Sequence, residues 1–137
     1  MFAHKLAQRG LSDRIEVDSC GTSGYHPGEA PDRRAVAAAA RRGYDLSGLR
    51  ARQVTASDFQ RSELILAMDR ANLEQLEQRR GNRFSGELGL FLACAPGLGV
   101  DEVPDPFFGQ DDGFAYVLDL IEAASDALIE RLQRDAE

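Results

Sequence analysis

Residues 64–68 read Leu-Ile-Leu-Ala-Met, a continuous apolar run between Glu63 and Asp69. Five consecutive apolar residues bounded by polar ones are typical of a strand covered on both faces of a parallel sheet. Asp69 is a favourable N-cap, and Leu73 and Leu76 follow it on one face of a predicted helix. A buried strand that leads directly into a helix favours an α/β fold.

Helix and strand patterns also alternate on the amino-terminal side of this run. Residues 2–9 have a helix-forming composition, and Gly10 is a plausible stop. Residues 14–19 alternate apolar and polar side chains, which predicts a strand. Residues 31–43 predict a helix that opens on Pro-Asp and closes on glycine, and residues 55–58 have the form of a capping box.

The carboxyl-terminal half continues the alternation. Residues 88–94 form another apolar run, and the two prolines within residues 103–106 keep that segment extended and stiff. A long amphipathic helix is predicted to close the chain, from helically spaced apolar residues at Phe114, Val117, Leu118, Ile121, Leu128 and Leu132. The sequence therefore predicts one domain over residues 1–137, a three-layer parallel α/β sheet flanked by helices.

Composition narrows the class of protein. The 137 residues are 43% hydrophobic and 28% charged, with a net charge of −7 and two cysteines. Two cysteines are too few for a disulfide framework, and no secretory signal or membrane span is evident, so we expect a cytoplasmic protein. The negative charge argues against nucleic acid and anionic membranes as partners.

Four segments carry a specific resemblance. Residues 17–26 (VDSCGTSGYH), 51–55 (ARQVT), 66–72 (LAMDRAN) and 103–109 (VPDPFFG) occur in this order. They are similar to the segments VDSAGTSGWH, ARQ-hydrophobic-Thr, LAMDxxN and VPDPYYG of bacterial low-molecular-weight protein tyrosine phosphatases. The chain thus resembles this family along essentially its whole length.

The resemblance implies a mechanism that needs no cofactor and no metal. In the family, a loop with a cysteine and an arginine separated by five residues binds phosphate through its backbone N–H groups, and its thiolate attacks phosphorus. An aspartic acid from a later loop protonates the leaving phenolate. Asp105 matches that acid, although an Asp-Pro dipeptide by itself indicates only an ordinary turn. The implied substrate is a phosphotyrosine protein or a small aryl phosphate.

The cysteine-to-arginine loop has no counterpart in the 137 residues. Six positions after Cys20 stands His26, and six after Cys94 stands Val100. Aligned to the family, Met1 falls inside the helix that follows the loop. We therefore expect an amino-terminally truncated domain that lacks the first, central strand of the family's sheet. Such a chain would hydrolyse phosphotyrosine through a phosphocysteine only when the loop is present.

Several other positions match residues around the family's cleft. Tyr25 matches an aromatic wall residue, and Phe107 and Phe108 replace the usual tyrosine pair, so the three rings are candidate contacts for the substrate ring; one of the phenylalanines equally fits a core anchor. Ser19 matches a serine that hydrogen-bonds the phosphate loop from outside the reacting atoms. Leu49 stands where a histidine often supports the same loop, and leucine offers no hydrogen bond.

Two other functions stay open at this point. A catalytically inactive remnant that acts as a binding or regulatory protein would retain the same motifs. An arsenate reductase on the related scaffold would need a set of redox cysteines, and Cys20 and Cys94 lack the expected spacing. The oligomeric state and the physiological substrate are beyond what these patterns determine.

Overall fold

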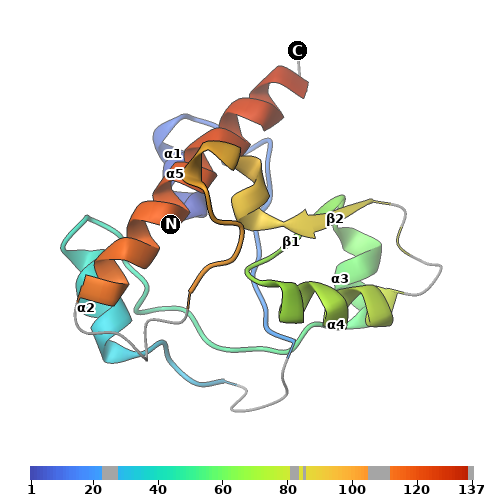
Figure 1. Cartoon of the computed structure of the whole chain (residues 1–137), viewed down its shortest axis with the longest axis horizontal. Coiled ribbons are helices and arrows are strands. Elements are labelled where there is room, and N and C mark those ends of the chain that lie inside the picture. Colours follow the sequence, from blue (N-terminus) through green and yellow to red (C-terminus); the bar gives the residue numbers. More distant parts are fainter. Residues whose placement is uncertain (23–27, 81–83, 85, 105–111, 136–137) are drawn as a thin grey trace.

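The computed structural model describes residues 1–22, 28–80, 84, 86–104 and 112–135. The chain runs through its elements in the order shown in Figure 1. They are α1 (Phe2–Gln8), α2 (Arg33–Ala40), α3 (Ala56–Arg61), β1 (Leu64–Ala67), α4 (Arg70–Arg80), β2 (Glu87–Leu90), the 3₁₀ turns η1 (Phe91–Cys94) and η2 (Pro96–Leu98), and α5 (Asp112–Asp135).

The sheet is small and parallel. β1 pairs with β2 in a register that sets Leu64 opposite Glu87 and Ala67 opposite Leu90. A parallel pair requires a crossover connection, and α4 provides it. Helices lie on both faces of the sheet, with α3 and α4 on one side and α1 and α5 on the other (Figure 1). The predicted α/β class with a parallel sheet and flanking helices is confirmed, and the described part of the sheet has two strands.

Local signals place the helix ends as the sequence predicts. The Asp32 carboxylate accepts the Arg34 N–H at 2.7 Å at the start of α2. Past the end of α2, Gly43 adopts φ +89°, a left-handed conformation that side chains other than glycine rarely tolerate. Asp69 accepts the Asn72 N–H at 2.7 Å and so caps α4.

The strand predicted for residues 14–19 is wrong. Residues 15–20 carry no strand assignment, and the first pairing after them is an isolated parallel bridge between Gly21 and Gln53. Val17, the central apolar residue of the pattern, leaves 40% of its surface exposed. Alternating side chains favour extended backbone, but a strand also requires a neighbour for its N–H and C=O groups. Within the described residues, this segment has none.

β1 is also less buried than its apolar run predicts. Leu64, Ile65 and Leu66 are half-buried, and Ala67 alone is fully buried. A strand in a parallel sheet is fully buried only where helices cover both faces and neighbouring strands flank its edges. Only β2 lies along it in the part of the chain that the structure describes.

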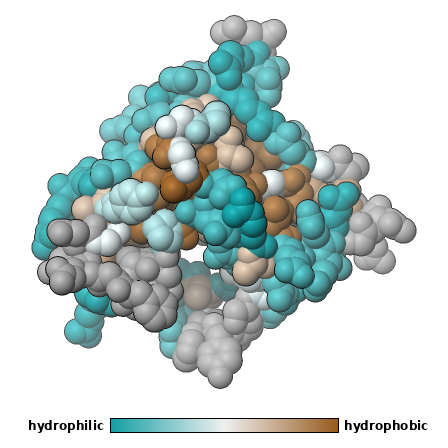
Figure 2. Space-filling view, in the orientation of Figure 1, coloured by the Kyte–Doolittle hydropathy of each residue, from teal (hydrophilic) through white to brown (hydrophobic). Residues whose placement is uncertain are grey.

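The core consists of three clusters of buried side chains. The first combines α3, β1 and α4 around Phe59 and Leu76; the second combines α5 and η1 around Leu92 and Leu128; the third joins α2 to α5 through Ala39 and Leu118. Apolar surface remains visible near the centre of the face in Figure 2. None of the helices in the described ranges is long and apolar enough to cross a membrane.

Candidate active site

The structure describes one of the five residues that the sequence assigns to the site. Asp105, Phe107, Phe108 and Tyr25 lie outside the described residues. Ser19 is described and exposed, at the end of the extended segment 15–20. The chain on either side of the two undescribed segments, residues 23–27 and 105–111, is described. The contacts of these flanking residues therefore show where the two loops of the site begin and end.

Ser19 makes its hydrogen bond through the backbone. Its N–H donates to Asp18 Oδ1 at 2.8 Å, and within the described ranges its hydroxyl has no partner. Leu49 is 51% exposed, so its apolar side chain neither packs in the core nor forms a hydrogen bond. Neither side chain is therefore held by a hydrogen bond within the described ranges.

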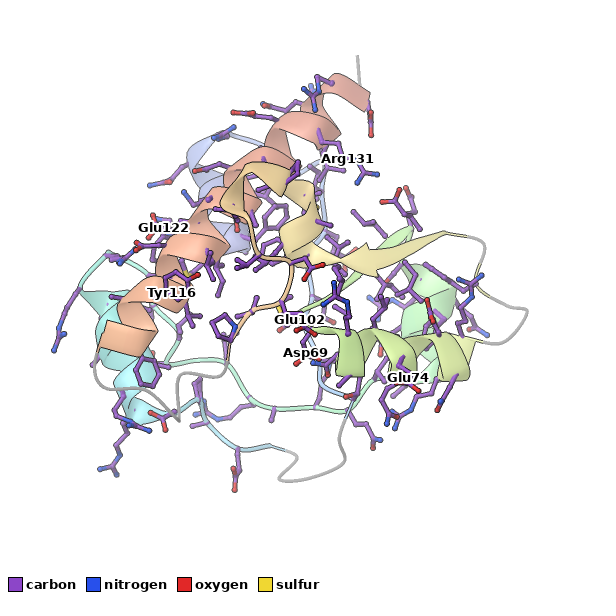
Figure 3. All side chains as sticks on the ribbon, viewed as in Figure 1. Asp69, Glu74, Glu102, Tyr116, Glu122 and Arg131 are labelled. Carbon is purple, nitrogen blue, oxygen red and sulfur yellow. The ribbon has the colours of Figure 1, made fainter. Side chains whose placement is uncertain are left out.

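The segment that leads to Asp105 is tied to the carboxyl end of β1. Val103 donates its N–H to the carbonyl oxygen of Met68 at 2.8 Å. One residue earlier, Glu102 Oε1 accepts the backbone N–H of Arg70, the first residue of α4, at 2.9 Å. The Arg70 guanidinium in turn pairs with Asp101. Figure 3 shows Glu102 beside the start of α4, near Asp69.

Sequence reasoning missed Arg70 and Glu102. Both stand next to residues that it singled out, since Arg70 follows the helix cap and Glu102 precedes the Val-Pro-Asp-Pro segment. The opposite charges of Arg70 and Glu102 were the feature of the sequence that could have indicated a contact. Their separation of 32 positions in the sequence gave no reason to expect contact, because only the return of the chain to the end of β1 brings them together.

The segment that contains Tyr25 is held at both ends by residues 51–54. Gly21 donates its N–H to the Arg52 carbonyl at 2.8 Å and accepts from the Val54 N–H at 2.8 Å. On the far side of the gap, Gly28 donates to the Ala51 carbonyl at 2.7 Å. The two ends are therefore anchored to one extended stretch of chain.

A side-chain network joins this loop to α4. Thr22 Oγ1 donates to Asn72 Oδ1 at 2.8 Å, and Asn72 Nδ2 donates to Asp69 Oδ1 at 2.8 Å. Asp69 directly follows Met68, which anchors the segment before Asp105. The segments that lead to Tyr25 and to Asp105 are thus both held at the carboxyl end of β1. In parallel α/β sheets this is the end at which ligands bind.

The Arg52 guanidinium donates hydrogen bonds to two carboxylates. It donates to Asp58 at 2.9 and 2.8 Å and to Asp18 at 2.8 Å. The hydrogen bonds from Arg52 lower the pKa of Asp58 to about 2. Because two carboxylates already neutralise this guanidinium, it acts as a brace between α3 and the segment before Gly21.

Neither thiol has the properties of a nucleophile. Desolvation, reinforced by the nearby Asp58 carboxylate, raises the pKa of Cys20, and desolvation likewise raises the pKa of Cys94. Both cysteines are free thiols. A raised pKa keeps a thiol protonated near neutral pH, and the thiolate is the reactive form. This electrostatic setting disfavours both thiols as nucleophiles.

No cluster of three or more metal-ligating side chains occurs among the described residues. What the described framework offers is two anchored loops at one end of a parallel sheet. Near the middle of the face in Figure 2 the surface is hollowed.

Comparisons with known proteins give the same class. The chain matches the family described as low molecular weight phosphotyrosine protein phosphatase over residues 1–137. It is 39% identical to a putative low molecular weight protein-tyrosine-phosphatase of Synechocystis, over 96% of this chain and 83% of the relative. It is 35% identical to a low molecular weight protein-tyrosine-phosphatase of Streptomyces coelicolor, over 100% of this chain and 85% of the relative.

Solved structures agree with the sequence matches. A protein tyrosine phosphatase from Entamoeba histolytica superposes with a TM-score of 0.92 at 29% identity, covering 99% of this chain and 86% of that one. YfkJ from Bacillus subtilis superposes with a TM-score of 0.89 at 28% identity, covering 99% and 84%. The fold and the loop framework are those of a phosphatase-like α/β domain. The chain belongs to the low molecular weight phosphotyrosine protein phosphatase family.

Proposed function

We propose that this chain provides the acid loop and the aromatic wall of a protein-tyrosine phosphatase that acts on phosphotyrosine or a related aryl phosphate. Asp105 donates a proton to the leaving phenolate, which turns a poor leaving group into a neutral phenol. The rings of Tyr25, Phe107 and Phe108 contact the substrate ring, and Ser19 supports the phosphate-binding loop from outside the reacting atoms. The chemistry uses no metal and no cofactor.

The observation that carries this proposal is the double anchorage at the carboxyl end of β1. The hydrogen bond from Val103 to Met68 precedes Asp105 by two residues, and Thr22, three residues before Tyr25, bonds to Asn72 beside Asp69. Two loops that start from neighbouring points can bring an acid and an aromatic ring to the same substrate. Membership of the family supports the assignment of the acid.

We further propose that the 137-residue chain does not hydrolyse phosphate esters by itself. It contains no cysteine followed by arginine six positions later, and both of its thiols have a raised pKa. Hydrolysis proceeds through a phosphocysteine once a Cys-x5-Arg loop is supplied at its amino-terminal side. We place the protein in the cytoplasm, where phosphotyrosine proteins are available.

The test compares two proteins with p-nitrophenyl phosphate as substrate. The 137-residue chain is expected to show no turnover between pH 4 and pH 8. The same chain, extended at its amino end by a strand and a Cys-x5-Arg loop of a family member, is expected to turn over. Asp105→Asn in the extended protein should lower kcat by about 100-fold, within the range for loss of a general acid. Asp13→Asn, which removes an exposed carboxylate outside both loops, is the matched control and should retain most of the activity.

Two results would contradict the proposal. Turnover by the 137-residue chain that is lost in Asp105→Asn would require another nucleophile. An extended protein that folds, as judged by circular dichroism, but hydrolyses nothing would favour the inactive binding or regulatory protein.

A further inference from the structure

The amino-terminal end of α4 is capped by two carboxylates that come from different parts of the chain. The first backbone N–H groups of a helix have no partner inside the helix. Asp69, directly before α4, accepts the Asn72 N–H at 2.7 Å. Glu102 Oε1 accepts the Arg70 N–H at 2.9 Å from 32 positions further along the chain. The first cap is local, whereas the second ties the segment before Asp105 to the helix.

The side chain of Arg70 contacts the same segment. Its guanidinium pairs with the Asp101 carboxylate, and its Nη1 lies 3.7 Å from Glu102 Oε2. Arg70 therefore holds two successive residues, through its backbone N–H and through its guanidinium. The negative charge of Glu102 also lies at the positive end of the α4 dipole, which stabilises it there. Figure 3 shows Glu102 at this end of the helix.

The exposure of these side chains limits what they add to global stability. The side chains of Arg70, Asp101 and Glu102 are 61%, 44% and 45% exposed. Ion pairs as exposed as these contribute little to the free energy of unfolding. We therefore expect the effect of the contacts to be local, on the path of the chain at residues 101–103.

This path is passed on to Asp105 through a stiff stretch of backbone. Val103, the residue after Glu102, donates its N–H to the carbonyl oxygen of Met68 at 2.8 Å. Pro104 fixes its own φ and confines Val103 to extended backbone. Few freely rotating backbone bonds thus separate Glu102 from Asp105, so a displacement of the first displaces the second.

We propose that Glu102 and Arg70 are positioning residues for the general acid. Their contacts set the direction in which the chain leads from the end of β1 to Asp105. The two residues act through Asp105 and not on the substrate, so the inference rests on the proposed function. Proton transfer depends on this direction, because a displacement of about 1 Å can lower a rate by about 100-fold.

The contact itself is tested in the 137-residue chain, without turnover. Amide hydrogen exchange at Arg70, followed by NMR, reports whether Glu102 accepts this N–H. Glu102→Ala should speed the exchange by about fivefold, whereas Glu102→Gln keeps an acceptor oxygen and should keep most of the protection. Glu74→Ala removes an exposed carboxylate from α4 and should leave the exchange unchanged. Circular dichroism checks that each variant folds.

The effect on the acid is tested in the extended protein that carries the Cys-x5-Arg loop. The phenolate of phenyl phosphate leaves poorly and needs a proton donor, whereas p-nitrophenolate leaves readily. For Glu102→Ala, kcat/KM should fall by about tenfold with phenyl phosphate and by less than about threefold with p-nitrophenyl phosphate. Glu102→Gln should regain most of the loss. Glu74→Ala should match the parent protein with both substrates.

A double variant separates positioning from a general structural effect. In Asp105→Asn there is no acid to position, so adding Glu102→Ala should change kcat/KM by less than about twofold. Arg70→Ala removes the guanidinium but keeps the backbone N–H. Its loss with phenyl phosphate should therefore be smaller than that of Glu102→Ala, and it should disappear in Asp105→Asn in the same way.

Two results would overturn the inference and leave the role of Asp105 intact. One is an unchanged exchange rate at Arg70 in Glu102→Ala. The other is a Glu102→Ala protein that affects both substrates equally, or whose loss persists in Asp105→Asn, while Asp105→Asn alone lowers kcat. If the extended protein folds but is inactive, or if Asp105→Asn leaves its kcat unchanged, the proposed function and this inference are both wrong.

Discussion

Arg52 and Asp58 form a bidentate ion pair at the first turn of α3. Both carboxylate oxygens of Asp58 accept from the guanidinium, and Oδ2 also accepts the Thr55 N–H at 2.8 Å. One carboxylate thus caps the helix and neutralises the arginine, which in turn reaches Asp18. The pair links the start of α3 to the segment that enters the Tyr25 loop.

The first prediction concerns the pH dependence of stability. The folded pKa of Asp58 is about 2, below its usual value of 3.8. The stabilisation is therefore present above about pH 4 and is lost as the pH falls towards 2. Because Arg52 is partly exposed, we expect about 1–2 kcal/mol rather than the full value of the shift. Urea unfolding between pH 2 and pH 7 measures it.

Asp58→Asn should remove this loss between pH 4 and pH 2 and should be less stable than the parent protein at pH 7. Glu16→Gln is the matched control, because the Glu16–Arg61 pair spans 3.5 Å between two largely exposed side chains. Its unfolding free energy should stay within about 0.5 kcal/mol of the parent. An unchanged pH profile in Asp58→Asn would contradict the assignment.

The second prediction concerns the close approach at the start of β2. A Cβ added to Gly86 would meet the carbonyl oxygen of Glu63 and would lie 2.7 Å from the Phe84 ring. Gly86→Ala should therefore lower the unfolding free energy by more than about 2 kcal/mol, because the backbone has to shift. A Cβ added to Gly89, within β2, meets nothing within 4 Å, so Gly89→Ala should be neutral or slightly stabilising. Equal effects in chemical denaturation would refute the steric explanation.

The third prediction concerns the hydroxyl of Ser125. Its Oγ is fully buried on α5 and has no hydrogen-bond partner among the residues that the structure describes. Ser125→Ala should raise the unfolding free energy by up to about 1 kcal/mol, since it removes an unsatisfied group at the cost of one small atom. The reverse exchange at its neighbour, Ala124→Ser, should lower it by about 1–3 kcal/mol. Thermal unfolding of both variants distinguishes the signs; a destabilised Ser125→Ala would reveal a hidden partner.

The fourth prediction concerns thiol reactivity. Cys20 and Cys94 both have a raised pKa, so little thiolate is present near pH 7. Alkylation by iodoacetamide should be slower in the folded protein than in the same chain in 8 M urea, and its midpoint should lie above the usual cysteine pKa. Single variants, Cys20→Ala and Cys94→Ala, report each thiol separately. A folded thiol that reacts faster than the unfolded chain would mark an activated nucleophile.

Local chemistry explains why much of the fold was predictable. Asp32 and Asp69 cap the helices that follow them, and Gly43 ends a helix, because each acts through neighbours within a few residues. The long apolar pattern of residues 114–132 likewise predicted α5. Among the site residues, Asp105, Tyr25, Phe107 and Phe108 stay predictions, whereas the anchors around them are observed.

The sequence by itself determined the family, the α/β class and most helix ends. Motif order, hydrophobic periodicity and helix caps depend only on residues that lie close together in the sequence. Tertiary structure decided what depends on a distant partner. In the described part of the chain, residues 15–20 have no strand pairing and β1 has one strand neighbour, because strand formation requires a neighbouring backbone. Tertiary structure also brought Glu102 to Arg70 and Thr22 to Asn72 at the end of β1. The return of the chain to that strand creates those contacts.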